Sequence, residues 1–346
     1  MAPPSGSSLR WSLAGTEQQG SLLDDDVDPT RELREVEYLH VRARTIISEV
    51  PRASRMPFRY TINPYRGCSH ACTYCFARPT HEYLGLNGLE DFERRIVVKV
   101  NAVQRLAAEL ARPSWGGEHI AMGTNTDPYQ QAEGRYKLTR GIVEKLAEAR
   151  NPFSVLTKST MILRDLEIFA AAAKHTEVKA NLSIATLDED VWHTSEPGTP
   201  PPLRRLEAVA RLNQAGVPCG VLIAPILPGI SDGDEQLESI VRACVEAGAV
   251  SISSIGLHLR PGVRELFMPW LERVRPDLVD HYRALYGARN GYLAREEQER
   301  LSARVRTLVQ RFGGCAKSPR HSRLAVAPKP TRQAPEPPQE QLPLVG

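Results

Sequence analysis

Short runs of β-branched and apolar residues alternate with longer segments of helical periodicity through most of this chain. An apolar run of about four to eight residues predicts a buried strand, and the alternation predicts a parallel sheet with crossover helices. The expected strands are 58–63, 95–100, 119–123, 153–157, 178–185, 218–226 and 250–257. The expected helices are 102–111, 137–149, 161–174, 203–214 and 234–247.

Six or seven such βα units place the chain in the α/β class and fit a complete or partial (β/α) barrel. A doubly wound sheet is the second possibility. Both architectures place their chemistry at the carboxyl ends of the strands. The polar residues that follow each expected strand are therefore the candidates for a functional site.

The two ends of the chain differ from the middle in composition. Residues 1–36 mix Gly, Ser and Pro with four aspartates, and residues 317–346 contain seven prolines. Such segments bury too little apolar surface to offset the entropy lost on ordering. We therefore expect one folded domain over 40–313, with a helical C-terminal part, between disordered extensions at 1–36 and 317–346.

Composition excludes several classes of protein. Hydrophobic residues at 41% and charged residues at 25% exclude a wholly disordered or collagen-like chain. No apolar run approaches the ~18 residues of a membrane-spanning helix, and the first residues carry no apolar stretch suited to a secretory signal. We expect a cytoplasmic protein with no membrane association. The net charge of +3 is too small to indicate nucleic-acid binding by itself.

Three of the six cysteines fall within eight residues, at Cys68, Cys72 and Cys75. The other three are scattered: Cys219, Cys244 and Cys315. In a reducing compartment such a cluster indicates metal binding or redox chemistry before a disulfide framework. Three thiolates from one short loop suit an iron–sulfur cluster, and they leave one iron open to bind a reactant.

Two other structures fit the same cysteines. Positions i, i+4 and i+7 share one helix face, so the cysteines could belong to a buried core, although Gly67 and the flanking prolines favour a loop. A structural zinc ion needs four ligands, and His70 or His81 could supply the fourth. The sequence favours the iron–sulfur cluster and leaves both alternatives open.

At this loop the chain resembles the radical S-adenosylmethionine (SAM) superfamily, whose signature is CxxxCxxC with an aromatic residue, here Tyr74, before the third cysteine. The match is closer to the branch of spore photoproduct lyase and the related bacterial DNA-repair-lyase-like proteins. The resemblance runs from about residue 58 to about residue 291. It includes the blocks GTNTDPYQ (123–130), LTKS (156–159), NLSIA (181–185), EPGT (196–199) and LIAPILPG (222–229).

The resemblance implies a partial (β/α)6 barrel and a 4Fe-4S cluster held by Cys68, Cys72 and Cys75, with SAM on the open iron. It implies a lyase-like enzyme in which reductive cleavage of SAM yields a 5′-deoxyadenosyl radical that abstracts hydrogen from the substrate. The cofactor then carries the difficult chemistry, and the protein binds, orients and excludes water. Nucleic acid is the leading substrate class by this analogy, and a flavodoxin- or ferredoxin-like protein is the expected electron donor.

Four residues match positions at which the family contacts SAM. Lys158 corresponds to the lysine on the methionyl carboxylate, and Ser183 to the serine near the ribose. Thr126 corresponds to a hydroxyl near the methionyl amine, and the carbonyls flanking Tyr74 are expected near the adenine edge. The alternatives are a solvated lysine at a strand end and hydroxyls that only cap helices.

The chain departs from spore photoproduct lyase at two positions. That enzyme returns hydrogen to its product through a cysteine and a tyrosine, whereas the matching residues here are Thr124 and Phe76. Neither side chain has an X–H bond weak enough for hydrogen relay. We therefore expect a substrate other than the thymine lesion of spores.

Four further residues are substrate candidates, expected to face the mouth of the barrel: Tyr129, Gln130, His258 and Arg260. Arg260 could bind a phosphate or a carboxylate as a bidentate fork, or it could brace a loop. His258 could equally be a hydrogen-bonded structural histidine.

Two other functions fit the sequence. The first is a non-enzymatic zinc- or iron-binding protein that recognises nucleic acid through the arginine-rich segments 52–66 and 302–311. The second is a radical SAM enzyme that modifies tRNA or a peptide. Separately, the peptide Gln341–Val345 resembles the motif with which bacterial DNA enzymes bind the sliding clamp, with Val345 in place of the usual aromatic residue.

Overall fold

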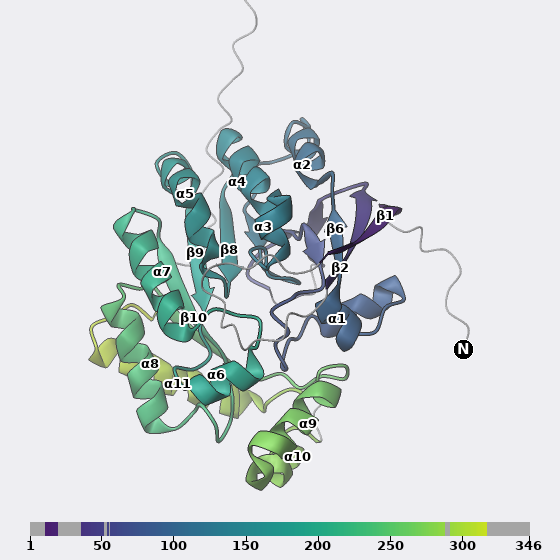
Figure 1. The fold of residues 1–346 in the computed structure, drawn as a ribbon. Helices are drawn as coiled ribbons and strands as arrows, with labels where there is room; N and C mark the ends of the chain where they lie inside the picture. The colour runs from purple at the N-terminus through teal and green to yellow at the C-terminus, as the bar shows by residue number, and fades with distance from the viewer. Residues whose placement is uncertain (1–10, 20–35, 52–53, 55, 288–290, 317–346) are drawn as a thin grey trace, which may run out of the picture.

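The computed structural model describes residues 11–19, 36–51, 54, 56–287 and 291–316, and the strands among them form two sheets (Figure 1). The larger sheet has seven strands in the order β11-β10-β9-β8-β7-β4-β3. Their bounds are β3 (Ile47–Glu49), β4 (Tyr60–Ile62), β7 (Ile120–Met122), β8 (Phe153–Thr157), β9 (Val178–Ser183), β10 (Cys219–Ile226) and β11 (Ile252–Gly256).

The six strands from β4 to β11 pair in parallel and in chain order, while β3 pairs antiparallel with β4 at the edge. A doubly wound sheet would reverse its strand order at a switch point. The larger sheet has no such reversal among its described strands. The prediction of a partial (β/α)6 barrel is therefore confirmed, with six expected strands placed to within two residues at each end.

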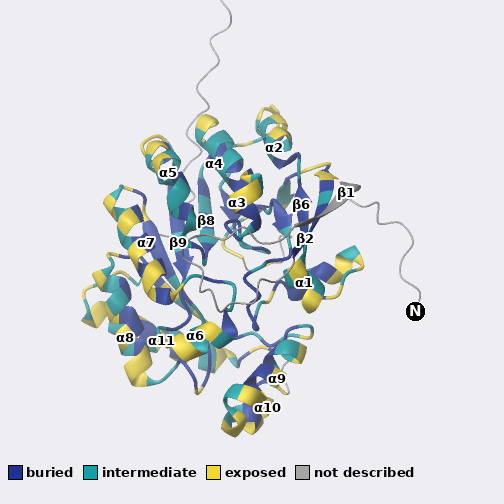
Figure 2. Ribbon diagram, in the orientation of Figure 1, coloured by how far each residue is buried: buried dark blue, intermediate teal, exposed yellow. Residues whose placement is uncertain are grey.

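The expected helices cover the outer face of this sheet (Figure 1). They are α2 (Ala102–Leu110), α4 (Leu138–Glu148), α5 (Leu166–Ala173), α7 (Pro202–Gln214) and α8 (Asp234–Glu246). In α7 the buried stripe includes Leu206, Val209 and Leu212, the spacing of one helix face. Figure 2 shows the outward sides of these helices as exposed.

The remaining helical elements have no separately bounded counterpart among the expected helices, although the expected helix 161–174 includes most of the 3-10 turn at 160–165 and a helical C-terminal part was expected. They are α1 (Glu90–Arg94), α3 (Ala132–Tyr136), α6 (Glu189–Ser195), α9 (Arg264–Val274), α10 (Val279–Tyr286), α11 (Arg295–Arg311) and the 3-10 turns η1 (Arg78–Leu84), η2 (Thr160–Asp165) and η3 (Pro276–Leu278). Helix α11 packs against β11 and α8 and covers the end of the sheet. Within the described part of the chain, no helix combines the length and apolar character needed to cross a membrane.

The expected strand at 95–100 was wrongly assigned to the barrel. It forms β6 (Arg95–Lys99) in the smaller sheet, whose order is β1-β2-β6-β5. Its neighbours are β2 (Val36–Ala43), which is parallel, and β5 (Tyr65–Arg66), which is antiparallel. An apolar run indicates burial but not which sheet provides it.

The structure also differs from the disorder expected near the N-terminus. Residues Trp11–Gln19 form β1, which pairs antiparallel with β2 over the full length of β1. This pairing satisfies backbone groups that β2 would otherwise leave open at a sheet edge. Most of the predicted extensions, including Gln341–Val345, lie outside the described residues.

Helix α7 gives a direct test of the core. Leu212 is fully buried, whereas Leu203 on the same helix is 58% exposed. Leu212→Ala is expected to lower the free energy of unfolding by about 2 to 5 kcal/mol because it leaves a cavity. Leu203→Ala is the matched control and should stay within about 0.5 kcal/mol. Equal effects of the two substitutions in denaturant unfolding would contradict the packing.

Candidate functional site

The candidate site begins at the cysteine loop, residues 67–76, which directly follows strand β5 of the smaller sheet. Gly67 has a φ of +80°, and a Cβ added there would lie 2.7 Å from the Phe92 carbonyl oxygen. The next amide, of Cys68, donates to that same oxygen at 2.8 Å. Only glycine fits this turn, and the start of the loop is therefore fixed against helix α1.

The three cysteines of this loop are buried or nearly so, with Cys75 the most accessible. Burial raises the pKa of the Cys68 thiol, and the negative charges of Asp127 and the other two thiols raise it further. Burial also raises the pKa of Cys72 and of Cys75. Three thiolates can share this environment only with positive charge among them, which a metal cluster supplies.

The donor set therefore fits an iron–sulfur cluster in its chemistry. The side chains are not arranged as a finished metal site, since no group of three or more His, Cys, Asp or Glu in the described ranges is placed to hold a metal ion. His70 and His81, the expected fourth ligands of a zinc site, each have another partner. His70 Nδ1 lies 3.3 Å from Asp127 Oδ2, and His81 Nε2 lies 3.1 Å from the Arg95 carbonyl oxygen.

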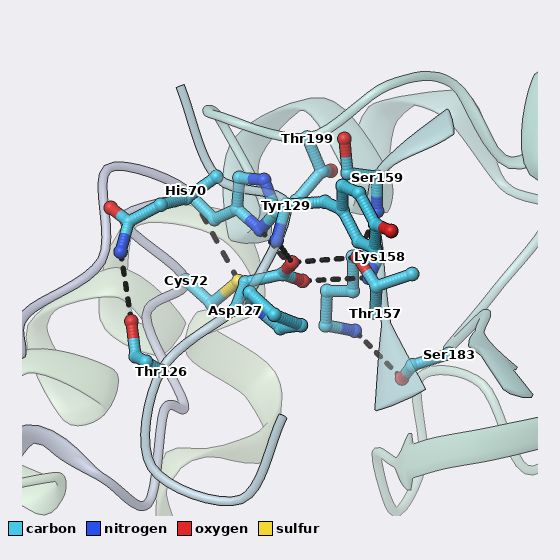
Figure 3. A network of polar contacts seen from close by, with 12 residues as sticks. His70, Cys72, Thr126, Asp127, Tyr129, Thr157, Lys158, Ser159, Ser183 and Thr199 are labelled. Carbon is cyan, nitrogen blue, oxygen red and sulfur yellow. Dashed lines mark hydrogen bonds and ion pairs between the residues drawn. The ribbon is translucent and has the colours of Figure 1, made fainter. Parts of the chain in front are cut away.

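Lys158 is the centre of the site, directly after β8. Its side chain is 13% exposed, and its ammonium lies 3.1 Å from Ser183 Oγ (Figure 3). The same ammonium lies 3.3 Å from the Tyr74 hydroxyl. The ammonium also stands 5.4 Å from the centroid of the Tyr74 ring. Three of the four residues predicted to contact SAM therefore meet at one ammonium.

Thr126, the fourth of these residues, does not contact the Lys158 ammonium in this way but packs against the first residue of the cysteine loop, Gly67. Its hydroxyl donates to the Gly67 carbonyl at 2.6 Å and accepts from Gln130 Nε2 at 2.8 Å. The side-chain oxygen of Gln130 in turn accepts from the Ser69 amide at 3.0 Å. Thr126 and Gln130 together hold the backbone of the loop.

Glu196, which the sequence analysis did not single out, is the carboxylate partner of Lys158. It is 1% exposed and lies 2.9 Å from the Lys158 ammonium and 2.5 Å from Arg205. Burial alone would raise the pKa of Glu196, but the charges of Arg205 and Lys158 outweigh it and hold that pKa well below its usual range. The residue begins the EPGT block, whose match to the family was the available signal.

Asp127 is a second carboxylate of the site that sequence reasoning missed, and its side chain is 9% exposed (Figure 3). It accepts from Thr157 Oγ1 at 2.6 Å and from the Lys158 amide at 2.7 Å, and it pairs with His70. Burial opposes ionisation, but His70 and these hydrogen bonds hold the pKa of Asp127 below its usual value. Asp127 therefore joins the cysteine loop to the carboxyl end of β8.

The end of α6 and the segment that follows it lie directly against the cysteine loop. The Thr73 amide donates to the Ser195 carbonyl at 3.0 Å, and the Gly198 amide donates to the His70 carbonyl at 2.9 Å. A Cβ added at Gly198 would lie 2.2 Å from the Ser69 carbonyl oxygen. This close approach requires glycine at position 198.

Two of the four substrate candidates were wrong, because they do not face the mouth of the barrel. Tyr129 is fully buried, and its hydroxyl donates to Asp165 at 3.0 Å. Gln130 is also fully buried, and its side-chain oxygen accepts from the Ser69 amide of the cysteine loop. Polar residues after a strand can point inward when a neighbouring loop has backbone groups to satisfy.

Of the other two candidates, Arg260 contacts the cysteine loop, and His258 contacts Tyr292. Arg260 Nη2 donates to the Phe76 carbonyl at 3.3 Å, although the two residues are 184 positions apart. The Phe76 side chain is 48% exposed beside this contact. The His258 ring packs 5.0 Å from that of Tyr292, and burial and the nearby Arg260 lower the pKa of His258.

Comparison with known proteins identifies the family. The model of the radical SAM superfamily matches residues 62–243, more than half of the chain. The chain belongs to the radical SAM superfamily. It is 42% identical over 316 residues to uncharacterized protein Rv2578c of Mycobacterium tuberculosis, covering 88% of this chain and 93% of that one. It is 29% identical over 199 residues to uncharacterized protein MJ0683 of Methanocaldococcus jannaschii, covering 57% and 70%.

Solved structures agree with this assignment. Spore photoproduct lyase complexed with dinucleoside spore photoproduct superposes with a TM-score of 0.59 at 19% identity, covering 80% of this chain and 79% of the other. A cysteine-to-serine mutant of spore photoproduct lyase gives a TM-score of 0.57 at 20% identity, covering 77% of each chain. The fold is that of the spore photoproduct lyase branch, and the chain is a radical SAM enzyme.

The contact at Gly198 generates a prediction. Gly198→Ala should force the cysteine loop away from the residues after α6, costing about 1 to 3 kcal/mol of stability as an overpacked site does. Iron content after anaerobic reconstitution should fall with it. Gly116→Ala is the matched control, because a Cβ there meets only Glu118 Cγ at 3.8 Å. Unchanged stability and full iron content in Gly198→Ala would show that the loop is not held there.

Proposed function

We propose that this enzyme cleaves SAM reductively at a 4Fe-4S cluster held by Cys68, Cys72 and Cys75, and uses the resulting radical on an organic substrate. The observation that carries the proposal is the meeting of the cysteine loop with the ends of β8 and β9 at the Lys158 ammonium. A largely buried cation, near enough to Cys72 and Cys75 for its charge to act on their thiols, suits the carboxylate of a SAM molecule bound to the same cluster.

The residues of the site have distinct roles in this proposal. Lys158 binds the methionyl carboxylate, and the Ser183 hydroxyl, which donates to the Ala224 carbonyl at 3.0 Å, accepts a hydrogen bond from the ribose. The Thr126 oxygen retains a lone pair for the methionyl amine, and the carbonyls flanking Tyr74 bind the adenine edge. When bound, the cluster supplies the electron that converts SAM to methionine and a 5′-deoxyadenosyl radical. The protein's own task is to orient SAM and exclude water.

We propose nucleic acid as the substrate class. Support comes from the fold shared with a lyase that binds a dinucleoside photoproduct, and from Arg260 beside the exposed ring of Phe76. Guanidinium groups pair with phosphates, and exposed aromatic rings stack on bases. The Thr124 hydroxyl lies 2.6 Å from the Thr61 hydroxyl and cannot replace a hydrogen-donating thiol. The enzyme therefore completes its reaction without the relay of spore photoproduct lyase.

Two partners complete the proposal. A flavodoxin- or ferredoxin-like protein supplies the electron. The peptide Gln341–Val345 is a further candidate for binding a sliding clamp.

Anaerobic reconstitution tests the proposed chemistry. The wild-type protein should bind about four irons per chain and release 5′-deoxyadenosine from SAM with dithionite, measured by mass spectrometry. Cys72→Ala should lose both iron and product. Cys219→Ala is the control, because Cys219 is a buried thiol of β10 outside the loop. Full iron in Cys72→Ala, or stoichiometric zinc with no cleavage of SAM by the wild type, would contradict the proposal.

The same assay identifies the substrate. Single-stranded DNA, tRNA and peptide fractions are added separately with SAM, and deuterium transfer from labelled material into 5′-deoxyadenosine is followed. Acceleration by DNA is the expected result. Acceleration by tRNA alone would keep the nucleic-acid class and exclude DNA, and acceleration by peptide alone would contradict the proposed class. Both results would leave the SAM chemistry intact.

A further inference from the structure

The two carboxylate oxygens of Glu196 point to different parts of the molecule. Oε2 accepts from Arg205 Nη2 at 2.5 Å and from Thr199 Oγ1 at 3.1 Å. Oε1 accepts from the Lys158 ammonium at 2.9 Å and from the Tyr74 hydroxyl. One oxygen therefore faces a buried arginine, and the other faces the residues that meet around Lys158.

Arg205 is an anchor fixed by the barrel. It is fully buried on α7, and it donates from Nε to the Pro200 carbonyl at 2.9 Å and from Nη1 to the Ser183 carbonyl at 2.9 Å. These contacts tie Glu196 to the end of β9. A lysine side chain has four flexible carbons, so the position of its ammonium depends on such partners.

The charges around Glu196 do not balance. Two buried or nearly buried cations, Lys158 and Arg205, share this one carboxylate, which leaves a net charge of about +1. Unpaired charge in a site of low exposure is costly, and one additional carboxylate would neutralise it. The local charge therefore favours binding of a group with one negative charge beside Lys158.

We propose that Glu196 is a positioning residue for SAM. Braced by Arg205, it holds the Lys158 ammonium toward the methionyl carboxylate and, through the same oxygen, holds Tyr74 of the cysteine loop. The proposal rests on the proposed function, because it takes SAM as the ligand of Lys158. Its new content is that one buried carboxylate sets the position of the cofactor-binding lysine relative to the cluster loop. A simple structural ion pair between Glu196 and Arg205 would not require the second oxygen to face the site.

Binding of labelled SAM to the unreduced, reconstituted protein, followed by anaerobic equilibrium dialysis, tests this role without turnover. Glu196→Gln should weaken binding by at least about tenfold, the loss expected when a charge-assisted hydrogen bond disappears. Iron content should stay at the wild-type level. Glu196→Asp keeps the charge but is too short to reach both cations, and its affinity should lie between those of wild type and Glu196→Gln.

A spectroscopic readout separates positioning from stability. Addition of SAM should change the electron paramagnetic resonance spectrum of the reduced wild-type cluster. The change should be smaller in Glu196→Gln when the two proteins are compared at the same fraction of SAM-bound sites. The control is Glu109→Gln, which removes another buried carboxylate that accepts from the Ile46 and Ile47 amides away from the site. This control should lower the melting temperature and leave SAM affinity and the spectral change intact.

The outcomes distinguish the two proposals. Affinity of Glu196→Gln within about twofold of wild type, or an equal loss in Glu109→Gln, overturns the positioning role and leaves the proposed function standing. Absence of SAM binding by the wild-type protein overturns both. If Glu196→Gln does not fold, Glu196→Asp decides the question, and wild-type affinity in that variant counts against the proposal.

Discussion

The ion pair between Lys158 and Glu196 is the interaction on which the candidate site depends. A lysine at the end of a parallel strand is ordinarily solvated, but here its ammonium is largely withdrawn from water and needs a carboxylate partner. The partner comes from the segment after α6, and Arg205 of α7 fixes it in turn. Removing Glu196 would leave both cations without a carboxylate partner, whereas removing Lys158 would leave Glu196 paired with Arg205 alone.

Asp127 makes a second connection of the same kind. It holds the backbone of Lys158 on one side and His70 of the cysteine loop on the other. Glu196 connects the side chain of Lys158 to Tyr74 of the same loop. Two carboxylates of low exposure thus join the cysteine loop to β8, Asp127 through the Lys158 backbone and Glu196 through the Lys158 side chain. The loop's thiols and the lysine are held as one unit by these contacts.

The sequence predicted the barrel well because most of its parallel strands, such as β7, β9 and β10, are short and largely buried apolar runs. It misplaced β6, whose run is equally apolar but pairs with β2 and β5, since periodicity carries no information about the partner strand. It also missed β1, whose residues include the polar stretch GTEQQ and gain order through pairing with β2. Strand partners are a tertiary property, and local pattern does not specify them.

The sequence predicted those site residues that belong to a recognisable motif, but not the side-chain contacts between them. Tyr74, Lys158 and Ser183 were selected by motif, and they meet in the structure. Asp127 and Glu196 lay inside quoted motif blocks, but their importance comes from partners up to 122 residues away. Tyr129 and Gln130 were misjudged because the cysteine loop and Asp165 use their polar atoms inside the fold.

A structure of the reconstituted protein crystallised anaerobically with SAM tests the central claim most directly. The account predicts that the Lys158 ammonium lies within hydrogen-bonding distance of the methionyl carboxylate while still contacting Glu196 Oε1. A SAM molecule bound away from Lys158, or a Lys158 side chain turned out to solvent with Glu196 paired only to Arg205, would contradict it.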